Sequence, residues 1–470
     1  MNAARPSTRF RRAIAIVVLA TLTGSCTVGP TYVRPSAPVP STYKEAIDWV
    51  VATPADVLER EPWWLVFQDP VLNELESRVE VSNQNVAAAV AAYDQARALV
   101  RQQRAALFPV VNLNASARRV GAGDTSGASD YQVSIGAGWE PDVWGRLRRT
   151  VDSASAASEA TLADLAAARL SAQGELAINY FGLRQADAQK ALLVETIDGY
   201  QRALEITQNR YDAGIVAKTD VLQAQTQLKT SQAEELGLER TRAEFEHAIA
   251  VLIGEPPANF SLAAKSWSPT PPEIPIGVPS TLLQRRPDIA AAERRVAQAN
   301  EQIGIAESAY YPSFGLTAAV GTGGVRLGDL FNVSALVWSV GASLAQKLFD
   351  AGATREAVAG TRAAYEQSVA QYRQTVLSAF QDVENQLVAT RVLRQQQELR
   401  RQAAEAAEAV QTQIRNRYRA GQAVYTEVVI AQATALNAQR ALVQLIGDQH
   451  TTAVALIQSL GGGWEASSTR

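Results

Sequence analysis

Few residues of this chain are of the types that carry out catalytic or metal chemistry. Its 470 residues include two histidines, His247 and His450, a single cysteine, Cys26, and a single methionine. Both histidines lie in alanine-rich helical stretches, which argues against a histidine-based triad or a zinc cluster. The stretch GTGGVRLG at Gly321 superficially suggests a phosphate loop. It lacks the following Lys-Ser/Thr and lies between two predicted strands, so a surface loop is the better interpretation. We therefore expect no enzyme activity and no cofactor.

The single cysteine follows a segment with the order of an export signal. Four arginines between Arg5 and Arg12 precede the run AIAIVVLATLTG, which is short for a bilayer span. The stretch LTGSC is similar to a bacterial lipobox, although Thr23 stands where Leu is usual. We expect cleavage before Cys26 and a lipid on its sulfur; the alternative is an ordinary secretory signal with an incidental cysteine. Thr27, rather than Asp, favours the outer membrane as the destination.

Composition excludes some classes of protein. The net charge is −3, with lysine and arginine spread evenly, so no basic patch indicates a nucleic-acid partner. After Cys26 no apolar run reaches about 18 residues, so a membrane crossing would have to use strands. With one methionine and one cysteine, the chain also lacks the soft ligands that Cu(I) favours. We expect no metal sites and an organic cargo.

The sequence of one predicted turn occurs twice in the chain. RYDAGIVAKTDVLQAQ begins at Arg210, and RYRAGQAVYTEVVIAQ begins at Arg417, 207 residues later. Earlier in the chain the offset is 203, which matches Pro109 with Pro312. The register therefore changes by four residues between Pro109 and Gly145, and we expect loops there that differ between the two halves.

Each half predicts a helix followed by two strands. The stretch 82–107 lacks proline and glycine and suits a helix. Alternation with period two then appears in VVNLNASARRV and YQVSIGAGWEPDVW, and again in SFGLTAAV and LVWSVGASLAQKLF. Strands of about ten residues with one apolar face fit an outer-membrane barrel.

A long helical hairpin ends each half. The proline-free stretches 145–210 and 352–417 predict helices of about 98 Å at 1.5 Å per residue. Each reverses at a glycine, Gly214 or Gly421, because a helix that ends there needs a residue that tolerates positive φ. A soluble antiparallel coiled coil is the simplest interpretation of these helices, but it leaves the strands unexplained.

Four strands cannot close a barrel, because a transmembrane barrel needs at least about eight. Three copies would supply twelve. We therefore expect a homotrimer, and we divide the chain into a signal peptide (1–25), a lipid-linked N-terminal segment and equatorial belt (26–81), repeat 1 (82–254, with a β-hairpin at 109–144 and a tip at 210–220), a Pro-rich linker and belt (255–287), repeat 2 (288–461, with a β-hairpin at 312–349 and a tip at 417–427), and a tail (462–470).

Several of these stretches resemble the TolC-type outer-membrane factor family, in its lipoprotein branch that includes OprM and NodT. The matching stretches are CTVGPTYVRP at Cys26, PWWLVFQDPVLNEL at Pro62, LLQRRPDIAAAER at Leu282, YYPSFGL at Tyr310, and both tips. They extend over the chain from Cys26 to Gly461.

The resemblance implies a mainly α fold with a membrane β-barrel portion: a trimeric TolC-like α/β barrel with twelve strands and a long periplasmic helical barrel. It implies a lipid-anchored outer-membrane exit duct of a tripartite efflux pump, which passively conducts small amphipathic compounds. Its partners would be outer-membrane lipids, an inner-membrane transporter and a periplasmic adaptor. Two alternatives stay open: a type I protein-secretion duct, and a coiled-coil envelope lipoprotein without a pore.

The resemblance also implies site residues at the tips. The periplasmic gate would be formed by Thr219, Asp220, Tyr418 and Glu427, and the adaptor would dock at Arg210, Gly214, Arg417 and Gly421. We expect the Tyr418 hydroxyl to bond to Asp220 across neighbouring hairpins.

Two family gate positions differ in this chain, where a latch arginine aligns with Ala423 and an aspartate with Ile430. For Asp220 and Glu427 the alternative role is to stabilise a helix N-terminus through its dipole, by about 0.3–1 kcal/mol.

Overall fold

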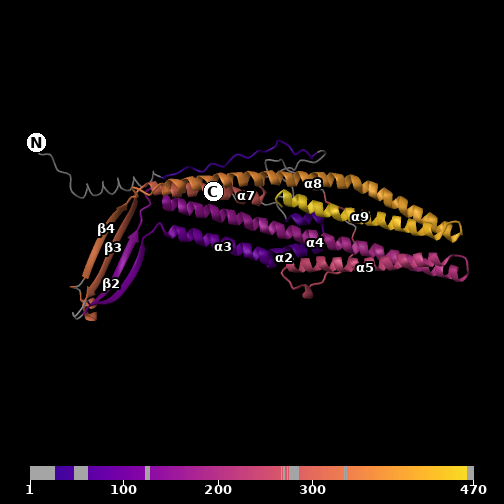
Figure 1. Ribbon diagram of the computed structural model, residues 1–470, viewed down its shortest axis with the longest axis horizontal. Coiled ribbons are helices and arrows are strands. Elements are labelled where there is room, and N and C mark those ends of the chain that lie inside the picture. The colour runs from indigo at the N-terminus through magenta and orange to yellow at the C-terminus, as the bar shows by residue number, and fades with distance from the viewer. Residues whose placement is uncertain are drawn as a thin grey trace. The chain divides into compact units, whose positions relative to one another are not determined.

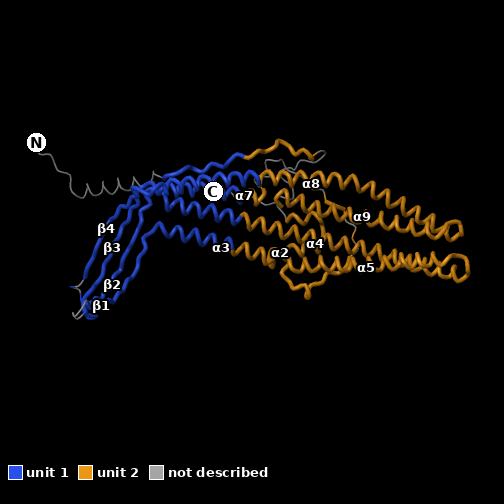
Figure 2. The backbone as a smooth tube through the Cα atoms, viewed as in Figure 1, with its two compact units in different colours: residues 1–36, 92–162, 291–374 blue, residues 37–91, 163–290, 375–470 orange. Residues whose placement is uncertain are grey.

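The computed structural model describes residues 27–46, 62–121, 127–265, 267, 270–272, 274, 285–332, 334 and 336–462. Cys26 and the predicted signal peptide lie outside these residues, as does the tail beyond residue 462. The chain divides into two units, coloured separately in Figure 2. Unit 1 comprises residues 1–36, 92–162 and 291–374, and unit 2 comprises residues 37–91, 163–290 and 375–470.

The described residues are mainly helical (Figure 1). The α-helices are α2 (Pro70–Ser82), α3 (Gln84–Ala105), α4 (Arg146–Asp212), α5 (Lys218–Leu252), α7 (Pro287–Glu307), α8 (Ala353–Arg419) and α9 (Tyr425–Ser459). The strands are β1 (Val110–Val120), β2 (Ala128–Trp139), β3 (Ser313–Gly324) and β4 (Leu336–Ala345). Short 3₁₀ helices are η2 (Trp63–Phe67), η3 (Pro257–Asn259), η4 (Ser308–Tyr310) and η5 (Leu327–Phe331).

The four strands of unit 1 form one antiparallel sheet in the order β1-β2-β3-β4. Its register places apolar side chains from all four strands in one row, Leu113, Ile135, Val320 and Trp338. A row on the opposite face holds Asn112, Gly136, Ala319 and Ser339. The apolar row is exposed, with Leu113 and Trp338 each 72% accessible. The predicted one-sided apolar strands are therefore confirmed.

The connections within the two β-hairpins differ in length. Residues 121–127 (seven residues) join β1 to β2, and residues 325–335 (eleven residues) join β3 to β4. This difference is the four-residue change of register that the repeat predicted. The strand pairing itself is equivalent, because Val110 pairs with Gly138 in the first hairpin and Ser313 pairs with Ala345 in the second.

The long helices keep a constant offset between the halves. Helices α4 and α8 each have 67 residues, and α5 and α9 each have 35, with both pairs beginning and ending 207 residues apart. A helix of 67 residues extends for about 100 Å at 1.5 Å per residue. Among the described helices, none combines the length and the apolar character that a bilayer span requires.

A buried ion-pair cluster fastens the Pro-rich linker to the helices of unit 2. Arg184 of α4 is 2% exposed; it lies 3.1 Å from Asp187 and donates to the Ala263 carbonyl at 2.8 Å. Asp187 also accepts a bond from Arg242 of α5 at 2.7 Å. Because every charge in this cluster has a partner, burial does not leave an uncompensated ion.

Glu76 of α2 is a buried carboxylic acid in unit 2. Its side chain is fully buried, and neither carboxyl oxygen has a hydrogen-bond partner among the described residues. Burial, and to a lesser degree the neighbouring Glu80, raises the pKa of Glu76 to about 9. The folded state therefore holds Glu76 protonated at neutral pH, whereas an unfolded chain ionises it.

We predict that replacing Glu76 removes a pH dependence of stability. Folding raises the pKa of Glu76, so below about pH 4.5 its carboxyl is protonated in both states and does not lower the free energy of unfolding. Between about pH 4.5 and about pH 9, keeping the carboxyl protonated in the folded state lowers the free energy of unfolding by about 1.4 kcal/mol per pH unit. Glu76→Met should therefore raise the melting temperature more at pH 8 than at pH 5. Glu74→Met, at an exposed position of the same helix, is the matched control. Parallel pH profiles for Glu76→Met and the wild type would contradict the assignment.

Candidate functional site

The first hairpin reverses through a glycine-centred turn after α4. Gly214 has φ +74°, and its N–H donates to the Tyr211 carbonyl at 2.8 Å, while the N–H of Ile215 donates to the Arg210 carbonyl at 2.8 Å. These are the two bonds of a Schellman motif, in which the left-handed residue is glycine because a Cβ would be strained there.

The second hairpin repeats this geometry after α8. Gly421 has φ +78°, and the corresponding bonds run to Tyr418 at 3.0 Å and from Gln422 to Arg417 at 2.8 Å. The sequence therefore located both turns, and all four predicted docking residues lie in them. In Figure 1 the two turns lie next to each other at the ends of the helical hairpins.

Tyr418 joins the two turns. Its side chain is buried, in a cluster with Ala224, Tyr425 and Val428. The Tyr425 ring lies edge-on at 5.6 Å, and the guanidinium of Arg210 from the other hairpin lies 4.7 Å from the Tyr418 ring centre. Arg210 also donates to the Tyr418 carbonyl at 3.2 Å. A cation over an aromatic ring, combined with a hydrogen bond, fixes one hairpin end to the other.

The hydroxyl group of Tyr418 lies next to a different residue from the one we expected. Its oxygen lies 3.4 Å from the Thr207 Oγ1, and the hydrogen bonds of the described residues include none between Tyr418 and Asp220. Asp220 lies in the first turn of α5. Its charge contributes slightly, after burial and two tyrosines, to raising the pKa of Tyr425 to about 12. Within one chain the expected Tyr418–Asp220 bond is therefore not formed.

The other predicted gate residues lie at helix starts. Thr219 is exposed in the first turn of α5. Glu427 lies in the first turn of α9, where its carboxylate accepts a bond from the Val424 N–H at 3.4 Å. Glu427 thus makes the helix-capping contact that was the alternative to a gate role, and such a contact does not prevent a carboxylate from also facing a channel.

The equivalent tyrosine of the first turn is less enclosed. Tyr211 is 37% exposed, and the ammonium of Lys218 lies 5.1 Å from its ring centre. Arg417 donates to the carbonyl of Gln422 in its own turn at 3.2 Å. Sequence reasoning missed this difference and the roles of Tyr425 and Lys218. The 207-residue offset, which pairs Tyr425 with Lys218, was the signal that could have revealed it.

His450 is packed among aromatic side chains of unit 2. His450 is 1% exposed, its Nδ1 lies 2.8 Å from the Ile446 carbonyl, and its ring is 5.0 Å from those of Phe181 and Trp267. Burial lowers the pKa of the His450 imidazole, because desolvation disfavours the charged form. Among the described residues, no group of three or more His, Cys, Asp or Glu side chains could hold a metal.

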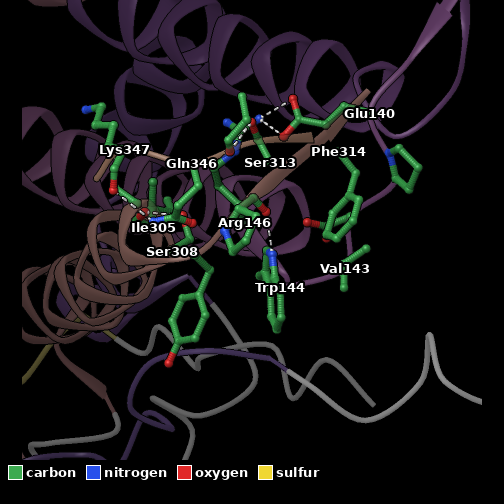
Figure 3. Close-up of a pocket in the computed structure, with 16 residues that line it drawn as sticks. Glu140, Val143, Trp144, Arg146, Ile305, Ser308, Ser313, Phe314, Gln346 and Lys347 are labelled. Carbon is green, nitrogen blue, oxygen red and sulfur yellow. Dashed lines mark hydrogen bonds and ion pairs between the residues drawn. The ribbon is translucent and has the colours of Figure 1, made fainter. Parts of the chain in front are cut away.

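A cavity lies in unit 1, where strands meet helices (Figure 3). It has a volume of about 400 Å³. Trp144 stacks on Tyr311 at 4.8 Å and donates to the Pro312 carbonyl at 2.7 Å. The Nη2 of Arg146 donates a hydrogen bond to each of the two carboxylate oxygens of Glu140, at 2.8 Å in both cases. Aromatic rings with a polar edge suit a membrane–water boundary, and the paired charges serve to fix the joint between β2 and α4.

Comparison with known proteins identifies the family. The sequence profile described as outer membrane efflux protein matches residues 75–255 and 278–462. The chain belongs to the outer membrane efflux protein family. Each of the two matched stretches contains one β-hairpin and one long helical hairpin.

Curated relatives of the chain include efflux pump proteins. The probable efflux pump outer membrane protein TtgC of Pseudomonas putida is 29% identical over 461 residues, covering 96% of this chain and 95% of that protein. The pyoverdine export outer membrane protein OpmQ of Pseudomonas aeruginosa is 29% identical over 467 residues, covering 96% and 97%.

Solved structures agree with the family. The outer-membrane channel OprN has a TM-score of 0.86 at 31% identity, covering 93% of this chain and 100% of that one. The open state of the MtrE channel of Neisseria gonorrhoeae has a TM-score of 0.84 at 26% identity, covering 95% and 100%. The predicted family, TolC-like fold, efflux role and outer-membrane location are confirmed.

We predict that the Tyr418 ring, rather than its hydroxyl, holds the two turns together. Tyr418→Ala removes the surface on which Arg210 and Tyr425 pack, so amides in residues 207–217 of the other hairpin should exchange with deuterium about tenfold faster, a local loss of about 1.4 kcal/mol. Tyr418→Phe keeps the ring and should leave this exchange within about twofold of the wild type, because a 3.4 Å contact contributes little. Equal acceleration by both variants would show that the hydroxyl carries the contact.

Proposed function

We propose that three copies of this chain form an outer-membrane exit duct for a tripartite efflux pump. The observation that carries the proposal is the four-stranded sheet, whose apolar row is exposed and whose outer strands, β1 and β4, have one neighbour each within the sheet. Strands inside a bilayer need partners on both edges, and a membrane barrel needs at least about eight strands. Three sheets would supply twelve strands, so β4 of one copy would pair with β1 of the next.

The long helices support a duct that extends away from the membrane. Helices α4 and α8, each about 100 Å long, connect the strands of each repeat to its turn along the chain, and a ring of six hairpins would enclose a channel. In this duct Thr219, Asp220, Tyr418 and Glu427 narrow the periplasmic mouth. The turns at Arg210, Gly214, Arg417 and Gly421 receive a periplasmic adaptor, and an inner-membrane transporter supplies the energy. The duct itself catalyses no reaction.

The relatives' names support a small organic cargo. A TtgC protein of Pseudomonas putida is named for toluene efflux, ArpC for antibiotic efflux and OpmQ for pyoverdine export. We infer that this chain passes small amphipathic compounds, with selection made by the pump that delivers them.

Cys26 is the proposed lipid anchor. We predict that cells fed labelled palmitate incorporate it into the wild-type protein, and that Cys26→Ser abolishes the label because no other cysteine exists. Trimers of Cys26→Ser should still assemble, since the sheet rather than the lipid joins the copies. Label retained in Cys26→Ser would refute the anchor.

Assembly and conduction test the duct directly. Detergent-solubilised protein should be a trimer by native mass spectrometry, and it should form discrete channels in planar bilayers. A spacer lipoprotein would produce no channels. A stable monomer as the sole species, or trimers without any conductance, would overturn the proposed function.

A further inference from the structure

The four described strands carry very few charged side chains. Arg118 and Arg119 lie in β1 and Asp130 lies in β2, while β3 and β4 contain no acidic or basic residue. These three charged residues are exposed in the described chain. What each can act on depends on the face of the sheet that its side chain occupies.

The register assigns the two arginines to opposite faces. Side chains alternate along a strand, so residues separated by an even number of positions share a face. Arg119 follows Leu113 of the apolar row by six residues and therefore lies on the apolar face. Arg118 follows Asn112 by six residues and therefore lies on the opposite face.

Asp130 lies directly opposite Arg118. The pairing of β1 with β2 places the two residues in the same row of the sheet. Residues in such positions on antiparallel strands have Cβ atoms about 4.5–5.5 Å apart and point to the same face, so opposite charges there attract each other. Within the described strands, the face opposite the apolar row therefore carries one positive and one negative charge, next to each other.

The other positions of this face hold uncharged and mostly small residues. In β1 they are valine, asparagine and serine, and in β2 they are alanine, glutamine, serine and glycine. In β3 and β4 they are glycine, serine, threonine, alanine and valine. The field on this side of the strands therefore depends on Arg118 and Asp130.

The second β-hairpin does not repeat the charge pair. Moving Arg118 by the offset of 203 gives Gly321, and moving Asp130 by the offset of 207 gives Val337. Gly321 and Val337 also pair with each other, so the position is kept while its charges are not. Three copies of the chain would supply three charge pairs rather than six.

The charge pair lies at the end of the strands that is farther along the chain from the helices. Strand β1 begins after α3 and β2 ends before α4, whereas Arg118 is near the last residue of β1 and Asp130 is near the first residue of β2. In the proposed trimer, on which this inference rests, the apolar face meets lipid and the opposite face lines the channel. The helices extend into the periplasm, so the three pairs surround the extracellular end of the channel.

We propose that Arg118 and Asp130 together set the charge preference at the extracellular end of the duct, each cancelling the field of the other. Charges on the wall of a water-filled cleft with low-dielectric surroundings raise the local concentration of ions of opposite sign. Adjacent opposite charges produce little net field across the channel, so anionic and cationic compounds leave through the same exit. Loss of either partner leaves a ring of three like charges.

Ion permeability in planar bilayers tests the pair. Arg118→Gln, Asp130→Asn and the double variant are compared with the wild type. Arg119→Gln is the matched control, because it removes the same charge from the adjacent position on the apolar face. The ratio of K⁺ to Cl⁻ permeability is taken from the reversal potential between about 0.1 M and about 0.01 M KCl, where the Debye length is about 10 to 30 Å. Native mass spectrometry checks that each variant is a trimer.

We expect Arg118→Gln to raise the K⁺ to Cl⁻ permeability ratio at least about twofold and Asp130→Asn to lower it at least about twofold, because three charges of one sign stay unpaired. The double variant and Arg119→Gln should keep the wild-type ratio. Both shifts should shrink in about 1 M KCl, where the Debye length falls to about 3 Å. A pair that only stabilised the β-hairpin would not produce this dependence on salt.

Three outcomes would each overturn the inference: single variants that form trimers and conduct with the wild-type ratio, a double variant as selective as a single one, or a shift in Arg119→Gln equal to that in Arg118→Gln. A wild type that forms neither trimers nor channels would instead refute the proposed function.

Discussion

Unpaired backbone at the edges of a small sheet is the constraint on which this structure depends. The order β1-β2-β3-β4 leaves the outer edges of β1 and β4 without partners in the sheet. In hydrocarbon, unpaired N–H and C=O groups cost several kcal/mol each, so a sheet with an exposed apolar row is incompatible with a solitary chain in a membrane. A ring of copies satisfies both edges, and the symmetry of that ring then constrains everything that continues from the strands.

The internal repeat also suits a ring of copies in which both edges of each sheet are paired. Each chain contains two copies of a unit that consists of a strand pair followed by a long helical hairpin. Three chains therefore supply six similar units, which approximate six-fold symmetry around the channel. The repeat is kept where the tube must be regular: helix lengths agree residue for residue, and both turns have glycine at φ near +75°. It diverges in the connections between strands, where seven residues are matched by eleven, and in the side chains that face a neighbouring hairpin.

Charged clusters supply rigidity where the helices meet the rest of unit 2. Arg184 is buried with Asp187 and holds the linker at Ala263. Arg286, in the stretch RRPDI, contacts Asp288 at 2.6 Å, Asp382 at 3.1 Å and the Ser459 carbonyl at 3.4 Å, and so connects the start of α7 with α8 and the end of α9. Removing one partner from such a cluster leaves a buried charge unpaired, which is costly.

Local sequence determined most of the fold. Period-two alternation fixed the apolar face of each strand, proline-free alanine-rich runs fixed the helices, and Gly214 and Gly421 fixed the turns, because these features depend only on neighbouring residues. The offset of 207 and its shift to 203 also located the unequal connections. The tertiary structure alone decided which side chains meet across hairpins. Over 67 residues a small departure from 3.6 residues per turn accumulates into a large rotation, so spacing could not show that Tyr418 lies against Arg210 and Thr207 rather than Asp220. Burial of Glu76 and Arg184 was equally invisible in the sequence, because desolvation depends on everything that packs around a side chain.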